Sequence, residues 1–532
     1  MSLTSREAAA CGAVFVPREQ TTTVEQTGLN VVYARDGDVV EAHIQIQHRG
    51  DEGTELGWVV PVMARPEVSI GSDPLFDRLL EGTVPLFRVR RNEEDNCSRG
   101  FSGCGAAGGG DERGDEGESE DPLRVAEGTV GVYDYARLEG GTVQEITQWL
   151  DDNGYAYDEQ SVPILQEYLA EGFGFLAFKL PRRSRGGEQA IHPVVLRYPG
   201  TEVCLPLRMT RIAGSERMSV RVFVLGSSRA VPSNYRHVEL NRLKISSDGD
   251  DYDREVYAAT HEQDTQGRAF VTEFAGSPPP ANATVYSELW DSRAFADLDP
   301  ADLTEVLMGQ RLLKCSADED ACTPEHPLLM DLLEAYLPPP WGKSAERFYS
   351  CSYCDPQALV GLDWDRAGFV EAMEEFIVGP GEQAADLLAL PYLTRMHAVM
   401  SPEEMTVDPV FHENPDLPDV SRLYSQTRVE NCEGPSRVVL DDGRRIFFDS
   451  NPPGFSSMPS SLRIEEIPPQ GAPVVLFDHS DAIDEELARW NAEHGPPPQG
   501  CDCRAVRWRW RGSGPLLLMF GLGLLARRRR GG

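Results

Sequence analysis

Four cysteines in the second half of the chain have the residue type, and part of the spacing, of a zinc site. Cys351 and Cys354 enclose two residues, which is the spacing of a zinc-ligand pair, and His326 lies nearby in the sequence. Cys315 and Cys322 are too far apart to form the second pair of such a site. The spacing therefore favours two local disulfides over zinc. A redox-active dithiol is a third alternative, although the strand–helix context that it requires is not recognisable around Cys351.

The other cysteines fit the same interpretation. The chain contains 11 cysteines, which are many for a cytosolic protein and common in an exported one. Cys97 and Cys104 lie in one acidic segment and are expected to close a small loop. Cys204 and Cys432 are candidates for a bridge between domains. Each bridge is expected to stabilise the fold by roughly 2–4 kcal/mol.

A run of carboxylates is the second group with metal-binding chemistry. Asp248, Asp250 and Asp253 are candidates to bind calcium, with Asp251 between them. The run lacks the glycine and the distal glutamate that an EF-hand loop requires. A solvated acidic loop is therefore favoured over a calcium site, and whether the chain binds a metal stays open.

Other catalytic signatures are not recognisable. Neither a phosphate-binding loop nor a dinucleotide-binding motif is present. The segment 100–103 lacks the residue spacing of a nucleophile elbow. His43 and His48 are expected to be solvent-facing strand residues. We therefore predict no catalytic residue and no cofactor, and a non-catalytic role is favoured while the question of enzymatic activity stays open.

The elements that would position these residues follow from hydrophobic periodicity. Strands over 29–35 and 39–48 flank the turn signal at 36–38 and predict an antiparallel hairpin. The second strand alternates between an apolar face and a polar face, and we expect the polar face to contact solvent. The apolar face is Val40, Ala42, Ile44 and Ile46, and the polar face is Glu41, His43, Gln45 and Gln47.

Further along the chain, capping signals predict helices. Thr142 and Glu145 form a capping box that begins a helix through Leu150. After a proline-rich boundary at 277–280 the pattern becomes mostly helical. Helices are expected over 299–313, 327–337, 369–378 and 387–396.

Together these elements predict an α+β fold, with a mostly antiparallel sheet and packed helices, then a smaller helical region and an irregular C-terminal segment. The expected division is a signal-peptide remnant over 1–11, an α+β domain over 12–276 with an acidic insertion at 92–121, a helical region over 285–411, a Pro-rich segment with short strands over 412–495, and a sorting or anchoring tail over 496–532.

The net charge of the chain limits the classes of molecule that it can bind. The chain has 532 residues, enough for two to four domains, and a formal net charge of −36. Because such a surface repels the phosphate backbone, nucleic acid is not expected as a partner.

The C-terminal tail has the features of a membrane-associated signal. The apolar run 515–526 has 12 residues, which as a helix would span roughly 18 Å, less than a bilayer core of about 30 Å. The arginines that follow are expected to stay cytoplasmic: Arg527, Arg528, Arg529 and Arg530. We therefore expect a transient or processed membrane segment. A basic tail that binds nucleic acid or anionic lipid is the alternative.

The order of motifs in this tail resembles the tripartite myxobacterial C-terminal sorting domain. It has Gly500-Cys501-Asp502-Cys503, then the apolar run, then the arginine cluster. The resemblance implies processing near Cys501 or Cys503 by a sorting protease, and retention at the cell surface. At the other end, Ala8-Ala9-Ala10-Cys11 resembles the end of a signal peptide, so we expect the true start to lie upstream of Met1.

The body is similar to the bacterial domain of unknown function 2330 from about Cys11 to Phe411. The residues that carry the similarity are Cys11-Gly12, 57–62, 150–155, 171–180, 268–276, 392–395 and 401–409. The resemblance implies a mostly exported protein and lends no catalytic residues.

Three functional hypotheses remain. The first is a surface-anchored structural or binding scaffold that contacts envelope components. The second is an envelope hydrolase whose site is assembled from residues distant in sequence. The third is a zinc-binding protein whose metal ligands are Cys315, Cys322, Cys351 and Cys354.

Overall fold

The structure is a computed structural model. It describes residues 12–18, 24–50, 56–63, 65–93, 124–157, 159–180, 187–263, 265–315, 322–354, 356–357, 359–431, 434–450 and 452–496.

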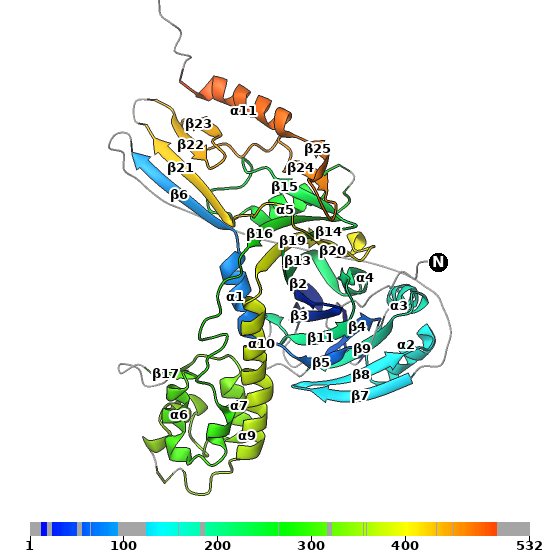
Figure 1. The fold of residues 1–532 in the computed structure, drawn as a ribbon, viewed down its shortest axis with the longest axis vertical. Coiled ribbons are helices and arrows are strands. Elements are labelled where there is room, and N and C mark those ends of the chain that lie inside the picture. Colours follow the sequence, from blue (N-terminus) through cyan, green and yellow to red (C-terminus); the bar gives the residue numbers. More distant parts are fainter. Residues whose placement is uncertain are drawn as a thin grey trace, which may run out of the picture.

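The centre of the molecule is a sandwich of two sheets (Figure 1). The large sheet runs in the order β25-β24-β15-β16-β19-β13-β2-β3-β11-β5, and β10 also pairs with β3. Its strands are β2 (Glu25–Asp36), β3 (Val39–Gly50), β5 (Glu67–Ile70), β10 (Gly187–Ala190), β11 (Val194–Pro199), β13 (Gly214–Gly226), β15 (Arg236–Leu240), β16 (Ala269–Gly276), β19 (Tyr392–Met400), β24 (Ser461–Glu466) and β25 (Val474–Asp478). The smaller sheet runs β1-β4-β9-β8-β7, with β1 (Ala13–Phe15), β4 (Leu56–Val62), β7 (Arg124–Val130), β8 (Tyr133–Glu139) and β9 (Gly174–Leu180).

The two sheets bury one continuous apolar core between them. The apolar face predicted for β3 lies in this core, and Ile44 and Ile46 are fully buried. Trp58 and Phe178 of the smaller sheet belong to the same cluster and their rings stack at 5.2 Å. Most strand pairs are antiparallel, with the exceptions β2–β13, β15–β16 and β6–β21. The predicted α+β class with a mostly antiparallel sheet is therefore confirmed.

Helices cover the outer faces of the sandwich. The predicted capping box is present at the start of α2, where Thr142 and Glu145 bond each other's backbone N–H groups. The helices are α1 (Asp73–Thr83), α2 (Val143–Asp152), α3 (Ser161–Ala170), α4 (Leu207–Thr210), α5 (Tyr252–Thr260), α6 (Leu303–Gly309), α7 (Leu329–Tyr336), α8 (Ala345–Ser350), α9 (Arg366–Met373), α10 (Gly379–Leu388) and α11 (Ser480–His494). A π-helical segment, η4 (Glu374–Val378), joins α9 to α10, and the 3-10 turns are η1 (Ser292–Phe295), η2 (Pro300–Asp302), η3 (Ser352–Cys354) and η5 (Pro402–Glu404).

The ends of the long axis carry two smaller parts (Figure 1). Helices α6, α7 and α9 form a helical lobe at one end, and α11 with a four-stranded sheet lies at the other. The Pro-rich segment supplies most of that sheet as short strands. The four-stranded sheet contains β6 (Leu86–Glu93), β21 (Leu423–Glu430), β22 (Ser436–Leu440) and β23 (Arg445–Phe448).

Two small sheets complete the fold. One contains β12 (Val203–Cys204), β14 (Arg229–Pro232) and β20 (Val410–Asn414), and the other contains β17 (Leu313–Lys314) and β18 (Thr323–Pro324).

Two local expectations were wrong. The helix expected over 387–396 is the end of α10 followed by β19, because Pro391 interrupts the helical pattern. The polar face of β3 is largely covered rather than solvent-facing, as is His48, which is 7% exposed. On that face His43 and Gln45 are 1% and 6% exposed, while Glu41 and Gln47 are partly exposed. Helices α1 and α10 cover it: Gln45 donates to Asp73 of α1, and Gln383 of α10 donates to Glu41. The polar side chains of β3 thus form a largely buried polar layer on the outer face of the large sheet, next to the apolar residues that pack against α1.

Candidate functional site

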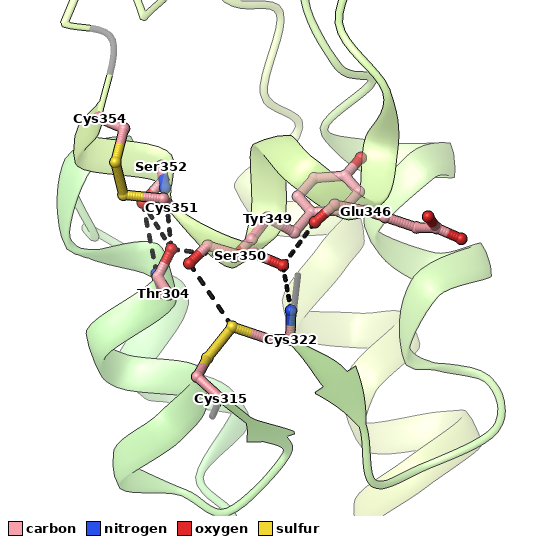
Figure 2. The surroundings of a disulfide bond; sticks show 9 residues. All are labelled: Thr304, Cys315, Cys322, Glu346, Tyr349, Ser350, Cys351, Ser352 and Cys354. Atoms are coloured by element: carbon pink, nitrogen blue, oxygen red, sulfur yellow. Dashed lines mark hydrogen bonds between the residues drawn. A yellow bond between two sulfur atoms is a disulfide. The ribbon is translucent and has the colours of Figure 1, made fainter. Parts of the chain in front are cut away.

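The helical lobe contains two disulfide-bonded cysteine pairs at the positions that local spacing indicated. Cys315 and Cys322 have a Cα–Cα distance of 4.2 Å, and Cys351 and Cys354 one of 5.4 Å. Figure 2 shows both pairs in one part of the lobe, with Thr304 of α6 and Ser350 of α8 beside them. Sulfurs bonded to each other cannot bind zinc as thiolates, so the zinc alternative requires that both pairs be reduced.

Hydrogen bonds tie the two disulfides into one framework. The N–H of Cys322 donates to Ser350 Oγ at 2.6 Å, and that hydroxyl donates to the carbonyl of Glu346 in α8. Next to the second disulfide, the N–H of Ser352 donates to Thr304 Oγ1 of α6 at 2.9 Å. The pairs thus fasten β17–β18, α6 and α8 together. His326 takes no part in this framework, because it is buried with its ring edge-on to Trp290. Burial lowers the pKa of His326 to about 4.

Removing the Cys315–Cys322 disulfide is expected to cost about 2–3 kcal/mol of unfolding free energy, because the unfolded chain gains the entropy of an open loop. Urea unfolding of the Cys315→Ser, Cys322→Ser double variant measures this loss. Adding reductant should destabilise the wild type by at least as much as the double substitution does. The result that contradicts the expectation is a double variant as stable as the oxidised wild type.

Of the other cysteines and tail residues singled out from the sequence, the structure describes Cys204. Cys204 is a buried free cysteine in β12, and burial raises the pKa of its thiol well above the ordinary value. Cys432, the other member of the expected inter-domain bridge, lies outside the described residues. So do Cys97, Cys104, Cys501, Cys503 and the arginines 527–530.

The calcium candidates do not converge on a common point. Asp248 accepts a hydrogen bond from the N–H of Asp250, and Asp251 accepts two from Ser246. The run therefore forms the turn that leads into α5. Within the described ranges, no group of three or more His, Cys, Asp or Glu side chains is placed to hold a metal ion. In the same part of the chain, no helix is long and apolar enough to cross a membrane.

The structure assembles a second constellation that the sequence analysis missed, on the outer face of the large sheet. His397 Nδ1 lies 2.9 Å from Glu273 Oε1, and His397 Nε2 lies 2.8 Å from Ser219 Oγ. Arg395 Nε lies 2.5 Å from the other oxygen of Glu273. His397 and Glu273 are each 1% exposed, whereas Ser219 is partly exposed. We call Ser219, Glu273 and His397 the outer-face triad.

Strand register explains why these side chains meet. β19 lies between β13 and β16, and His397 is paired with Arg221 on one side and Val271 on the other. The β16–β19 ladder has a bulge between Thr272 and Phe274, so Glu273 sits at an irregularity. Bulges are frequent where a side chain is re-aimed.

Electrostatics keep Glu273 ionised. Burial alone would raise its pKa, but the charge that His397 carries when it is protonated, the charge of Arg395 and the hydrogen bond from His397 lower the pKa to about 2. A carboxylate only accepts hydrogen bonds, so His397 Nδ1 carries the proton toward Glu273. In the neutral imidazole Nε2 is then the acceptor, and the Ser219 hydroxyl donates to it.

The polar layer continues across the sheet from the triad. Arg221 is paired with Asn30 of β2, and Asn30 with Gln45 of β3. Asn30 donates to Gln45 Oε1 at 3.1 Å, and Gln45 donates to Asp73 at the start of α1. A polar row therefore runs from β19 to α1.

A third cluster joins helices α3 and α4 to the segment that precedes β20. Asp408 accepts from the Tyr168 hydroxyl at 2.9 Å, from the Arg208 N–H at 2.9 Å and from Arg208 Nε at 3.0 Å. Arg208 also makes a two-bond contact with Glu171 at 2.8 Å. Burial raises the pKa of Asp408 above its ordinary value, and the Arg208 charge offsets part of that rise. Asp408 and Glu171 both belong to segments that carry the resemblance of the body to a known family.

Comparison with known proteins identifies that family and nothing more. A comparison with curated proteins finds no match, and a comparison with solved structures finds none. A family model matches residues 5–411, a range that contains both disulfide pairs, the outer-face triad and Asp408. The tail lies outside the matched range, so its resemblance stays a prediction. Because the match covers well over half of the chain, the protein belongs to the family described as an uncharacterized protein conserved in bacteria (DUF2330).

Proposed function

We propose that this protein is an exported, surface-anchored scaffold of the bacterial envelope. The observation that carries the proposal is the pair of disulfides in the helical lobe. Disulfides persist in oxidising compartments and are rare in the cytosol. The resemblance of the tail to a sorting signal supports the same location and supplies the means of anchoring.

The proposed role is contact with envelope components through the helical lobe. Among the described residues the most exposed large apolar side chains are Trp341 at 102%, Val360 at 84% and Tyr353 at 61%. All three lie in one segment of the lobe around the Cys351–Cys354 disulfide. Exposed aromatic and aliphatic side chains in one region are typical of a contact surface.

Cell fractionation with surface protease shaving tests the location, and peptide mapping without reductant tests the oxidation state. Trypsin cleavage after Lys314 and Lys343 leaves Cys315 and Cys322 in one peptide. Their disulfide appears as a mass lower by two hydrogens. Reduced cysteines with bound zinc in protein isolated from the cytosol would instead support the zinc hypothesis and overturn this proposal.

Replacing Arg527, Arg528, Arg529 and Arg530 by Ser is expected to release the protein into the medium or mislocalise it. The substitution removes the charge barrier that would hold the tail at the membrane until processing. Immunoblots of cell and medium fractions measure the distribution, and mass spectrometry of the mature C-terminus locates processing near Cys501 or Cys503.

The chain provides a matched control for this experiment. Arg504, Arg507, Arg509 and Arg511 lie on the other side of the apolar run, so replacing these four by Ser changes the total charge equally. The control should keep the protein at the surface. Surface retention without the terminal arginines, or an intact C-terminus on the mature protein, would count against the sorting model.

A further inference from the structure

We propose that the outer-face triad is a nucleophilic site that hydrolyses carboxylic esters. Ser219 is the nucleophile, His397 the base and Glu273 the group that orients the base. The carrying observation is the unbroken chain of contacts from Ser219 Oγ through both ring nitrogens of His397 to Glu273. This activity goes beyond the scaffold role and does not depend on it.

Ser219, His397 and Glu273 contact one another in the order that activation of a serine nucleophile requires. When the imidazole is neutral and its Nδ1–H donates to Glu273, the Ser219 hydroxyl, 2.8 Å from Nε2, is placed to donate its proton to that nitrogen. A base adjacent to the hydroxyl and a third group orienting the base are the requirements for serine nucleophilicity. The burial of the three residues is compatible with this order, since Glu273 and His397 are each 1% exposed whereas Ser219 is a partly exposed residue.

The position of Ser219 distinguishes it from an ordinary strand serine. The β13–β2 ladder is irregular between Gly214 and Ser219, so regular pairing with β2 begins at Ser219. Glu273 sits at the bulge in β16. Two backbone irregularities thus lie on either side of the strand that carries His397. Bulges are over-represented next to active sites.

Arg221 places a cationic side chain on the same strand face as the nucleophile. It follows Ser219 by two residues on the same face of β13 and is the cross-strand partner of His397. Its Nε is buried and has no hydrogen-bond partner among the residues that the structure describes. A buried, unpartnered guanidinium N–H on the same strand face as the reacting hydroxyl can stabilise the negative oxygen that forms when an ester carbonyl is attacked.

The start of α5 lies over the imidazole of His397. Asp253 Oδ1 lies 4.0 Å from His397 Nδ1, and the Asp253 side chain is 63% exposed. The ring of Tyr252 stacks over His397 at 6.4 Å. These contacts place α5 next to Nδ1 of His397, and Ser219, which contacts Nε2, is the partly exposed member of the triad.

The reaction balances with water as the only co-reactant. Ser219 Oγ forms a bond to the carbonyl carbon of the ester, and its proton passes to His397 Nε2. The ester C–O bond breaks, and the leaving alkoxide takes that proton as an alcohol. Water then attacks the acyl-serine and gives its proton to His397, and Ser219 departs with a proton as the carboxylic acid is released.

A fluorophosphonate probe and a p-nitrophenyl ester test the proposal on the full chain. Peptide mapping should find the probe on Ser219. Ser219→Ala should abolish that label, and both Ser219→Ala and His397→Gln should lower ester hydrolysis about 100-fold or more. Circular dichroism and thermal unfolding of each variant show whether it is folded.

Ser233→Ala is the matched control. Ser233 Oγ lies 2.7 Å from His412 Nδ1, which makes it a second serine–histidine contact, but His412 Nε2 has no hydrogen-bond partner among the described residues. Without an orienting carboxylate, Ser233 should not take the probe, and its loss should leave hydrolysis unchanged.

A substitution of the nucleophile gives a readout that does not depend on the choice of ester. In Ser219→Cys, alkylation by iodoacetamide should follow a thiol pKa below the ordinary value of about 8.5, because His397 accepts the proton. His397→Gln in the same background should remove this shift. A folded wild type without label at Ser219, Ser219→Ala with wild-type hydrolysis, or an ordinary thiol pKa at Cys in this position would each overturn the proposal.

Discussion

Replacing Arg395 by Met is expected to lower the unfolding free energy by about 3–5 kcal/mol, because the substitution leaves Glu273 buried without its closest cation. Arg395 and Glu273 have side chains that are 3% and 1% exposed, and their ion pair measures 2.5 Å. Thr83 of α1 also loses the Arg395 guanidinium as a hydrogen-bond donor at 3.3 Å. Urea unfolding at neutral pH measures the loss.

Arg463→Met is the matched control. Arg463 pairs with Asp478 at 3.2 Å, but the two side chains are 39% and 44% exposed. Solvent screening limits such a surface pair to about 0–1 kcal/mol. If the two variants lose similar and small amounts, the assignment of a stabilising role to the buried pair is wrong.

Acid provides a second readout of the same ion pair. The folded pKa of Glu273 is about 2, below the ordinary value of 4.5. A lowered pKa stabilises the fold above pH 4.5, and this stabilisation is lost as pH falls toward 2, a difference of roughly 3 kcal/mol. Without Arg395 the folded pKa rises, so unfolding of Arg395→Met should depend less on pH within that window.

The hairpin and the apolar core were predictable because they depend on local periodicity. Alternation in β3 identified Ile44 and Ile46 as core residues, and both are fully buried. The same alternation could not show that the polar face of β3 is covered. The covering residue Gln383 lies 342 positions from Glu41, its hydrogen-bond partner.

The strand β19 was missed for a related reason. Both of its faces are buried, so Thr394, Arg395 and His397 are enclosed along with the apolar residues between them. A strand buried on both sides loses the period of two that identifies half-buried strands. Its preceding leucines and alanines continue the helical pattern of α10 instead.

Sequence separation likewise decides which site could be anticipated. The two disulfides close separations of 7 and 3 residues, so their proximity follows from spacing alone. The triad joins residues 178 and 124 positions apart and exists only because β19 inserts between β13 and β16. The available signal was the presence of charged residues within otherwise apolar strands, at Glu273 and Arg395.

Asp408→Ala is the second substitution with a large expected effect, a loss of about 3–5 kcal/mol in unfolding free energy. Asp408 is the shared acceptor for the Tyr168 hydroxyl of α3 and for both the backbone and side chain of Arg208 in α4. Its side chain is 9% exposed, so the donors that it leaves behind have little access to water. The loss would loosen the attachment of α3 and α4 to the segment that precedes β20.

Two comparisons isolate this role of Asp408. Asp419 accepts a hydrogen bond from the Tyr392 hydroxyl at 2.7 Å in an exposed position, so Asp419→Ala should cost no more than about 1 kcal/mol. Asp408→Asn keeps one acceptor oxygen but removes the charge that faces Arg208, so its loss should be intermediate. Urea unfolding followed by tyrosine and tryptophan fluorescence measures all three variants. An alanine variant at Asp408 that unfolds at the wild-type midpoint would mean that Glu171 alone holds Arg208 in place.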